Sequence, residues 1–387
     1  MISPLNKLDK QLYSRVKVQS SNHSQSRLGC LVYVRNIARA KRELTRRLSL
    51  QSIVGEYPFI NAIGLKITLE ELEQLAHCTW VDYISSQVMV SALLHQTRLQ
   101  LGIDQLHTEG LLGNGITTVV IDTGCFPHLD LTLGQNRLFK FKDFIHNKPS
   151  PYDDNGHGTF ITGILAGNGK TSNGRYCGVA PSTRLIALKA LDSLGQTETF
   201  TVLSAMQWIY ENKRKYNIKV VCMSFGSNPL EHNDPLIKGA ESLWDAGLTV
   251  ICAGGNDGPA AKTIKSPGAS RKIITVGASS YNSLTNSFDV ADFSSRGPAF
   301  NYIKPDMLAP GVDITSLKND TTFYTKMSGT SVSAPFVAGT AVLLQQKHPH
   351  YSPNQIKSLL IHTAIRLPCE PNACGNGLLN PIGAIIG

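Results

Sequence analysis

Hydrophobic and polar positions follow two patterns along the 387-residue chain, and the change falls near residue 95. In the first part, the strand-like runs "CLVYV", "FINAIGLKIT" and "VDYISSQVMVSA" are separated by the helical patterns of "RNIARAKRELTRRL" and "LEELEQLAHC". This βαββαβ-like order predicts a small ferredoxin-like α+β domain over residues 28–95, with its helices on one face of a sheet. Residues 1–27 are polar, and we expect an irregular N-terminal extension there.

From Ile116 onward, nearly continuous apolar runs alternate with amphipathic helical patterns. Examples of the runs are "ITTVVIDTG", "IKVVCMSFG", "LTVICAGGN" and "KIITVGAS". Strands that are apolar on both faces are typical of a parallel sheet covered by helices on both sides. We therefore predict an α/β domain over residues 96–387, built on a doubly wound, mostly parallel sheet.

The net charge of +9 is concentrated in the first domain, where residues 1–95 contain 12 Lys and Arg against 7 Asp and Glu. The basic helix places Ile37, Ala40, Leu44 and Leu48 at helical spacing, so its cations form an ordinary solvated face. Aromatic residues are not interleaved with these cations, which argues against a stacking surface for nucleic acid. We expect neither nucleic acid nor a membrane as a partner.

The start of the chain, "MISPLNKLDKQLYSRVKVQ", has no apolar core of a secretory signal, and no run approaches about 18 apolar residues. We predict a cytoplasmic protein, with secretion by a non-classical route as the alternative. The eight cysteines are scattered, and several lie in strand-like runs, which favours buried thiols. Only Cys369 and Cys374, in "CEPNAC", are close enough to suggest a bridge or a metal, and the absence of a further ligand pair argues against zinc.

Two candidate catalytic residues follow apolar strands or precede helical runs. Asp122 ends the strand-like run in "VVIDTG", where the carboxyl ends of parallel strands line a crevice. His157 lies between two glycines in "DDNGHGTFITGILAG" and precedes a helical pattern. Each residue has an ordinary alternative, since Asp is common in turns and His at the start of a helix is often only a cap or a surface residue.

Two more candidates complete a set. Ser331, in "MSGTSVSAPFVAGTAVLL", starts a helical stretch, so its backbone N–H is an unpaired donor, although a plain N-cap would use the same residue. Pro335 is expected in the first turn of this helix, where its missing N–H costs little. Asn256 follows the strand-like run in "VICAGGNDGP" and could present an amide to the same crevice, or serve only in a turn.

Together these four residue types match the needs of acyl transfer. A serine hydroxyl is a weak nucleophile, so Ser331 needs the imidazole of His157 as a base. The imidazolium needs an oriented anion, which Asp122 supplies, and Asn256 with the N–H of Ser331 would stabilise the oxyanion.

The motifs "VVIDTG", "NGHGT", "AGGNDG" and "GTSVSAPFVAG", in this order, resemble the subtilisin-like serine peptidases over about residues 97–387. The resemblance assigns the family's catalytic positions to Asp122, His157, Ser331 and Asn256. It implies a serine endopeptidase that cleaves polypeptides through an acyl-enzyme. It also implies substrate binding by strand addition, with these residues along the peptide and the P1 pocket: Ser224, Phe225, Gly226, Ala253, Gly254, Gly255 and Lys265. Lys265, near the pocket base, would favour acidic P1 side chains or extend into solvent.

The segment "EYPFINAIGLKITLEELEQLAHCTWVDYISSQVMVSA" resembles the family's propeptide, which acts as an intramolecular chaperone and inhibitor. The resemblance implies a zymogen whose final propeptide segment lies in the cleft and which cleaves itself near residues 92–98. A propeptide without a secretory signal resembles the intracellular subtilisins. No cofactor is expected, and calcium is doubtful because "AGNGKTSNGRYCGVAP" lacks a convincing ligand set and Asp130 alone cannot form a site.

Some positions depart from the family pattern, and two other functions compete. Phe160 and Phe336 stand where histidine is common in relatives, and we expect both to serve packing. One competing function is a catalytically silent peptide-binding regulatory protein, which the complete set of catalytic groups argues against. The other is a lipase or esterase, but "GTSVS" lacks the strand–GxSxG–helix elbow of those enzymes.

Overall fold

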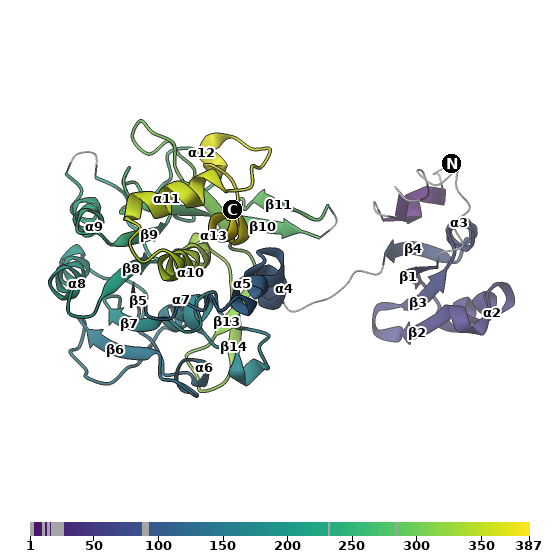
Figure 1. Cartoon of the computed structure of the whole chain (residues 1–387). Helices are drawn as coiled ribbons and strands as arrows, with labels where there is room; N and C mark the ends of the chain where they lie inside the picture. Colours follow the sequence, from purple (N-terminus) through teal and green to yellow (C-terminus); the bar gives the residue numbers. More distant parts are fainter. Residues whose placement is uncertain are drawn as a thin grey trace. The chain divides into compact units, whose positions relative to one another are not determined.

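The computed structural model describes residues 4–9, 12, 13, 16, 27–86, 93–230, 233–283 and 285–387. The chain divides into two compact units, Met1–Ser91 and Ala92–Gly387 (Figure 1). Helix α4 (Leu93–Gln100) belongs to the larger unit, so the division falls slightly before residue 95.

The smaller unit has the βαββαβ order that the sequence predicts. Its elements are β1 (Leu28–Val34), α2 (Ile37–Arg47), β2 (Ile53–Tyr57), β3 (Ala62–Ile67), α3 (Leu69–Ala76) and β4 (Val81–Ser86), with the short 3-10 helices η1 (Pro4–Lys7), η2 (Leu50–Ser52) and η3 (Pro58–Ile60). The antiparallel sheet has the order β2-β3-β1-β4. Strand β2 was not among the strand-like runs of the sequence, because it is a largely exposed edge strand without an apolar face.

The described part of residues 1–27 is packed, not irregular. Leu8, Leu12 and Val16 are 6%, 1% and 7% exposed and belong to the core of the smaller unit. Leu8 also forms a parallel bridge with Ile84 in β4. These apolar residues are isolated among polar ones, so the hydrophobic pattern of this stretch did not predict their burial.

The larger unit is built on an eight-stranded sheet with the order β11-β10-β9-β8-β5-β7-β6, and β12 pairs with β10 beside this path. Its strands are β5 (Thr117–Asp122), β6 (Leu138–Asp143), β7 (Arg184–Lys189), β8 (Ile218–Met223), β9 (Thr249–Ala253), β10 (Ile274–Asn282), β11 (Ser287–Val290) and β12 (Met307–Pro310). All pairs are parallel except β10 with β11. A separate hairpin joins β13 (Ile314–Leu317) and β14 (Tyr324–Met327).

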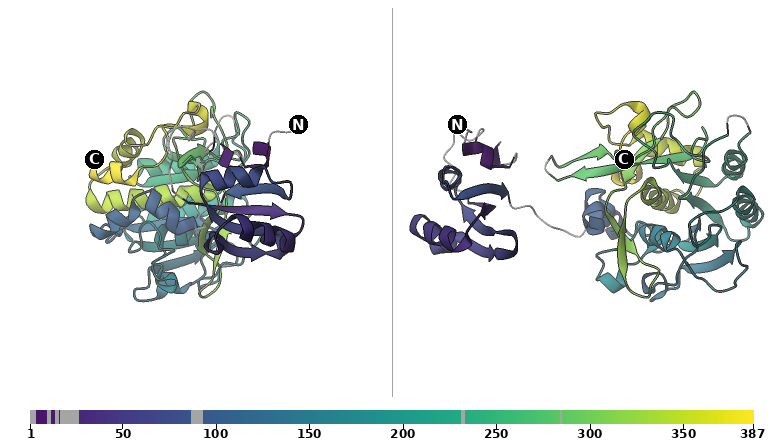
Figure 2. Two further views of the ribbon diagram at one scale, coloured as in Figure 1. Left: turned by 90° about the vertical axis from the view of Figure 1, so that its right-hand side faces the viewer. Right: turned by 180° about the vertical axis from the view of Figure 1, so that it is seen from behind.

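Helices cover both faces of this sheet, which confirms the predicted doubly wound α/β fold. Helices α8 (Thr199–Asn212) and α9 (Pro235–Asp245) pack on one face, and α7 (His157–Ala166) and α10 (Thr330–Lys347) pack on the other (Figures 1 and 2). The remaining helices are α5 (Ile103–Thr108), α6 (Leu129–Thr132), η4 (Lys170–Ser172), α11 (Pro353–His362), α12 (Pro371–Cys374) and α13 (Pro381–Ile386). Helix α10 is buried on nearly all sides, because small and apolar residues surround its axis over most of its length.

The strand order reverses at β5, which lies between β7 and β8. At such a switch point the connections leave in opposite directions and a crevice opens at the carboxyl ends of the strands. Asp122 ends β5, and its neighbour Ile121 pairs with Met223 at the end of β8.

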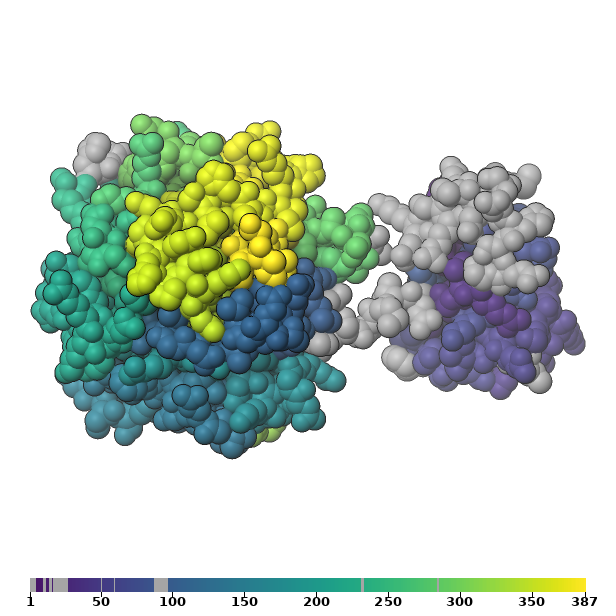
Figure 3. All heavy atoms as spheres, in the orientation of Figure 1, coloured from purple at the N-terminus to yellow at the C-terminus, as the bar shows by residue number. Residues whose placement is uncertain are grey.

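Figure 3 shows the outer surface of the same unit, with the blue residues of α4 and α5 beside the yellow residues near the C-terminus.

The structure decides between the bridge and the metal at Cys369 and Cys374, because these two residues form a disulfide. The other six cysteines are free, and all of them except Cys177 are buried. Among the described residues, no group of three His, Cys, Asp or Glu side chains is arranged to hold a metal ion. None of the described helices is both long enough and apolar enough to cross a membrane.

Candidate active site

A cavity of about 690 Å³ lies at the carboxyl ends of β5, β8 and β9. All four predicted catalytic residues line it, although they come from distant parts of the sequence: Asp122, His157, Asn256 and Ser331. Six of the seven predicted substrate-binding residues line it too: Ser224, Phe225, Gly226, Ala253, Gly255 and Lys265. The seventh, Gly254, does not, since it is buried behind the wall with its N–H bonded to Val276 O and its carbonyl to the N–H of Lys265.

Asp122 and His157 are joined by a hydrogen bond of 2.7 Å between Asp122 Oδ1 and His157 Nδ1. Asp122 is 1% exposed, and the N–H of Thr123 also donates to Oδ1. Because the carboxylate can only accept, Nδ1 carries the proton and Nε2 is left as the basic nitrogen. Gly158 permits this contact, since a Cβ there would lie 2.2 Å from Gly124 O.

The pKa of His157 is raised above its ordinary value by its acidic neighbours. Burial alone would lower it, but the charge and hydrogen bond of Asp122, and the charge of Asp153, favour the imidazolium more strongly. The ring is therefore suited to hold a proton that it takes from a nearby hydroxyl.

Asp153 is a supporting residue that the sequence reasoning missed. Its Oδ2 accepts hydrogen bonds from the N–H (2.8 Å) and the hydroxyl (2.6 Å) of Thr159, in the first turn of α7. Its Oδ1 accepts from Gly156 N–H (2.8 Å) and from the hydroxyl of Thr123 (2.9 Å). A carboxylate at a helix N-terminus satisfies orphan donors, so Asp153 fixes the turn that carries His157. In the sequence, the only feature that could have indicated this role of Asp153 is its place four positions before His157.

Ser331 is the second residue of α10, where backbone N–H groups have no acceptor within the helix. Pro335 lies inside the helix and not in its first turn, so that expectation was wrong. Because Pro335 has no N–H, the carbonyl of Ser331 lacks its usual donor four residues on. The hydroxyl of Ser224 donates to it instead, at 3.0 Å, and thereby ties the backbone of Ser331 to the end of β8.

Asn256 is oriented by Thr330, another residue that the sequence reasoning missed. Asn256 Oδ1 accepts from the N–H (2.8 Å) and the hydroxyl (3.0 Å) of Thr330. With the oxygen fixed, Nδ2 is the free donor of the amide. A Cβ on Gly329 would lie 3.0 Å from Ser331 Oγ and 3.3 Å from Asn256 Nδ2, so the amide and the hydroxyl meet at this glycine.

The described residues contain no hydrogen bond between Ser331 Oγ and His157 Nε2. Both side chains nevertheless line the same cavity. Catalytic hydrogen bonds are often long in enzymes without substrate and tighten when the complex forms, so this arrangement is compatible with a working pair.

Lys265 passes between the two glycines that form the pocket walls. A Cβ on Gly226 would lie 2.7 Å from Lys265 Cβ, and one on Gly255 would lie 2.5 Å from its Cγ. The ammonium is not free, because it pairs with the carboxylate of Asp257 and donates to Asn228 Oδ1 at 2.5 Å. Its charge is therefore partly neutralised before any substrate side chain arrives.

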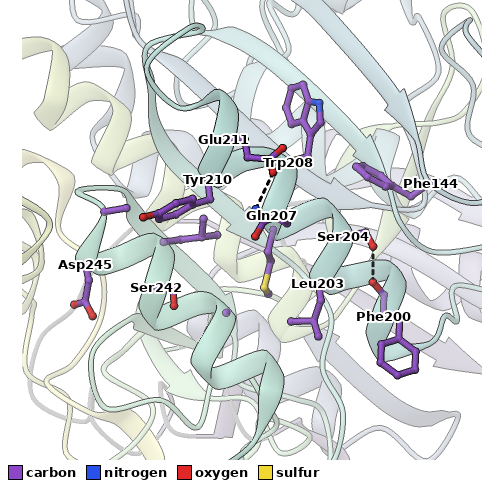
Figure 4. A pocket seen from close by; sticks show the side chains of 14 residues that line it. Phe144, Phe200, Leu203, Ser204, Gln207, Trp208, Tyr210, Glu211, Ser242 and Asp245 are labelled. Carbon is purple, nitrogen blue, oxygen red and sulfur yellow. Dashed lines mark hydrogen bonds between the residues drawn. The ribbon is translucent and has the colours of Figure 1, made fainter.

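A larger cavity of about 910 Å³ lies between α8 and α9 (Figure 4). Its labelled side chains come from both helices, with Phe144 beside them, and Phe200 at its edge is 78% exposed. No histidine, cysteine or lysine lines it, and its only titratable lining groups are Tyr210 and the carboxylates of Glu211 and Asp245, so it lacks the serine–histidine pairing of the first cavity. Phe160 and Phe336 are 0% and 1% exposed in the main core, as expected for packing residues.

Comparisons with known proteins agree with this geometry. The sequence pattern of the Subtilase family matches residues 113–384. The chain belongs to the subtilase family. The serine protease AprX of Bacillus subtilis (strain 168) is 35% identical over 372 residues, which cover 89% of this chain and 84% of AprX. Subtilisin Savinase of Lederbergia lenta is 33% identical over 274 residues, which cover 71% of this chain and 92% of Savinase.

Solved structures show the same likeness. Sphericase superposes with a TM-score of 0.61 at 27% identity, covering 69% of this chain and 92% of Sphericase. A cold adapted subtilisin-like serine proteinase superposes with a TM-score of 0.56 at 28% identity, covering 70% and 88% of the two chains. This subtilase is a serine-type endopeptidase that acts on polypeptides, which removes the lipase alternative.

Proposed function

We propose that Asp122, His157 and Ser331 are the catalytic triad of this endopeptidase and that Asn256 supplies the oxyanion donor. The observation that carries the proposal is the 2.7 Å bond between His157 Nδ1 and Asp122, in a cavity that Ser331 and Asn256 also line. The presence of every chemical group that turnover needs argues against a catalytically silent protein.

In the proposed mechanism, Ser331 Oγ attacks the scissile carbonyl carbon while His157 Nε2 takes the hydroxyl proton. The carbonyl oxygen becomes an oxyanion and accepts from Asn256 Nδ2 and the N–H of Ser331. When the C–N bond breaks, the imidazolium protonates the leaving amine, and the acyl group stays on Ser331 as an ester. Water, deprotonated by His157, then hydrolyses the ester and restores the hydroxyl.

The proposed substrate is an extended polypeptide held by its backbone. Residues 224–226 follow β8, and residues 253–255 begin at the last residue of the adjacent parallel strand β9. Five of these six residues line the cavity. Backbone pairing of this kind recognises any extended chain, so we expect broad specificity. For Lys265, an acidic P1 preference and extension into solvent both stay open, and the pairing with Asp257 weakens the first.

We also propose that the smaller unit is a propeptide and that the enzyme is a self-processed zymogen. Residues 87–92, in the final segment expected to enter the cleft, lie outside the described residues. Arg98 is bonded within the larger unit, to Gly174 O and Asp104, so the mature enzyme should keep it. We therefore expect cleavage on the N-terminal side of Arg98, within the predicted window of residues 92–98.

A single experiment tests both proposals. Purified protein is incubated with denatured casein, the cut sites are mapped by mass spectrometry, and the intact mass of the enzyme is followed. Wild type should digest casein and lose its first 91 to 97 residues, whereas Ser331→Ala should do neither. Casein digestion by Ser331→Ala would refute the triad. Digestion by a wild type that keeps its full mass would refute the zymogen alone.

The location of the protein stays a proposal with two alternatives. The sequence favours the cytoplasm, but the Cys369–Cys374 disulfide supports export by a non-classical route, because disulfides persist in oxidising compartments. Alkylation of thiols in intact cells, followed by reduction and a second label, distinguishes the two. Second-label incorporation at Cys369 and Cys374 supports export, and first-label incorporation supports the cytoplasm.

A further inference from the structure

The loop between α7 and β7, residues 168–177, is closed around a positive charge that the chain itself supplies. Gly169, Asn173 and Gly174 have φ angles of 66°, 52° and 80°, which curl the loop tightly. Nη1 of Arg98, in α4, donates to Gly174 O at 2.9 Å and to Cys177 O at 3.3 Å. Two backbone carbonyl groups of the loop therefore point at one guanidinium.

The guanidinium of Arg98 is buried and electrostatically paired. Its side chain is 9% exposed, and Nη2 forms an ion pair with Asp104 in α5. Converging carbonyl and carboxylate oxygens are also what a calcium ion takes as ligands, usually six to eight of them. Here a planar, permanently charged group occupies those oxygens.

Asp130, a fully buried acid that contacts the loop, is not available to a metal either. Its Oδ1 accepts from the N–H and the hydroxyl of Thr171, both at 2.8 Å, and its Oδ2 accepts from the hydroxyl of Tyr324 at 2.5 Å. The carboxylate thus binds the same loop through Thr171. A calcium ion would have to displace these protein donors before it could use either oxygen.

The closed loop is also connected to the strand that leads to the nucleophile. Tyr324 begins β14, which ends at Met327, shortly before Ser331. Its ring contacts that of Tyr176 in the loop, with centroids 4.6 Å apart, and α4 packs against β13 of the same hairpin. The order of the loop therefore bears on the support of the active site.

Calcium sites are common among subtilases, but the residues of this loop do not fit one. We propose that the guanidinium of Arg98 is the internal cation of the 168–177 loop and takes the place of a bound calcium ion. Because a covalently attached cation cannot be chelated, the loop keeps its order without calcium. This inference does not depend on the catalytic proposal.

The test is hydrogen–deuterium exchange of the backbone amides of residues 168–177 in the full chain. Every protein in the test also has the Ser331→Ala substitution, which prevents self-digestion. The protein is measured with EDTA and with millimolar calcium chloride. Arg98→Met removes the charge and keeps much of the stem, and Arg175→Met is the matched control, since Arg175 is an exposed arginine of the same loop. Arg98→Lys keeps the charge and guards against failure of the methionine variant to fold.

We expect identical exchange with EDTA and with calcium when Arg98 is present. In Arg98→Met, exchange of the loop should rise by about tenfold or more, and the unfolding midpoint should fall by about 5 °C, because the carbonyl groups of the loop and the half-buried carboxylate of Asp104 lose their partner. Arg98→Lys should lie between these values, and Arg175→Met should match wild type. Faster exchange of this loop in EDTA when Arg98 is present would overturn the proposal, as would Arg98 variants that behave like Arg175→Met.

Discussion

Two buried carboxylates on one stretch of chain, Asp122 and Asp130, have opposite surroundings. Both oxygens of Asp130 accept hydrogen bonds, from Thr171 and Tyr324. Asp122 uses only Oδ1, for Thr123 and His157, and its buried Oδ2 has no hydrogen-bond partner among the described residues. A carboxylate whose two oxygens both accept hydrogen bonds fixes structure. A carboxylate with one oxygen unpaired keeps acceptor capacity for an imidazolium that forms during a reaction.

Replacing the two carboxylates should give the largest contrast. Asp122→Asn should lower kcat by about 10⁴-fold with a small effect on stability, because the amide favours the wrong tautomer of His157. Asp130→Asn should lower the unfolding midpoint by several degrees and leave kcat per active site within about threefold. Active-site titration with casein kinetics separates the two effects. A loss of kcat in Asp130→Asn as large as in Asp122→Asn would erase the distinction.

The oxyanion site should show the next largest effect. Asn256→Ala should lower kcat about 10²–10³-fold with little change in KM, because the donor acts in the transition state. Thr330→Val keeps the N–H bond to Asn256 Oδ1 but removes the hydroxyl bond, so we expect a loss of about tenfold. Thr330→Ser restores the hydroxyl and is the control. Equal activity of Thr330→Val and wild type would show that Thr330 does not orient the amide.

The pH dependence of kcat/KM should reveal the influence of Asp153 on the pKa of His157. The base must be neutral, so kcat/KM falls as the pH drops through the pKa of free His157, which lies above its ordinary value. Asp153→Asn removes a negative charge that favours the imidazolium, so the acid limb should move to lower pH. Asp245→Asn, in an exposed pair with Lys272, is the control and should leave the limb in place. A shift to higher pH in Asp153→Asn would contradict the assigned sign.

The smallest expected effect concerns the P1 pocket. Asp257→Asn frees the ammonium of Lys265, so cleavage after Glu relative to Leu should rise about threefold, the magnitude of a partly exposed ion pair. Adding Lys265→Met should abolish the gain. An unchanged ratio in Asp257→Asn would mean that the ammonium extends into solvent instead of facing the P1 side chain.

The sequence predicted the parts that depend on local pattern. The apolar runs marked the main strands of the larger unit. The candidate residues were found at the ends of strands and the starts of helices: Asp122 and Asn256 near the ends of β5 and β9, and His157 and Ser331 at the starts of α7 and α10. Cross-chain contacts were not predictable in this way. Thr330 orients Asn256 across 74 positions, and Ser224, which follows β8, supplies the donor that Pro335 cannot give to Ser331 O in α10. Nothing in local periodicity encodes such pairs.

The most direct test of the central claim is covalent labelling with a fluorophosphonate, followed by peptide mapping. Such a probe reacts with a serine whose hydroxyl is activated by a neighbouring base. We predict phosphonylation of Ser331 in wild type, and none in His157→Ala even though Ser331 is retained. Label on a different serine, or equal labelling of Ser331 in His157→Ala, would contradict the account.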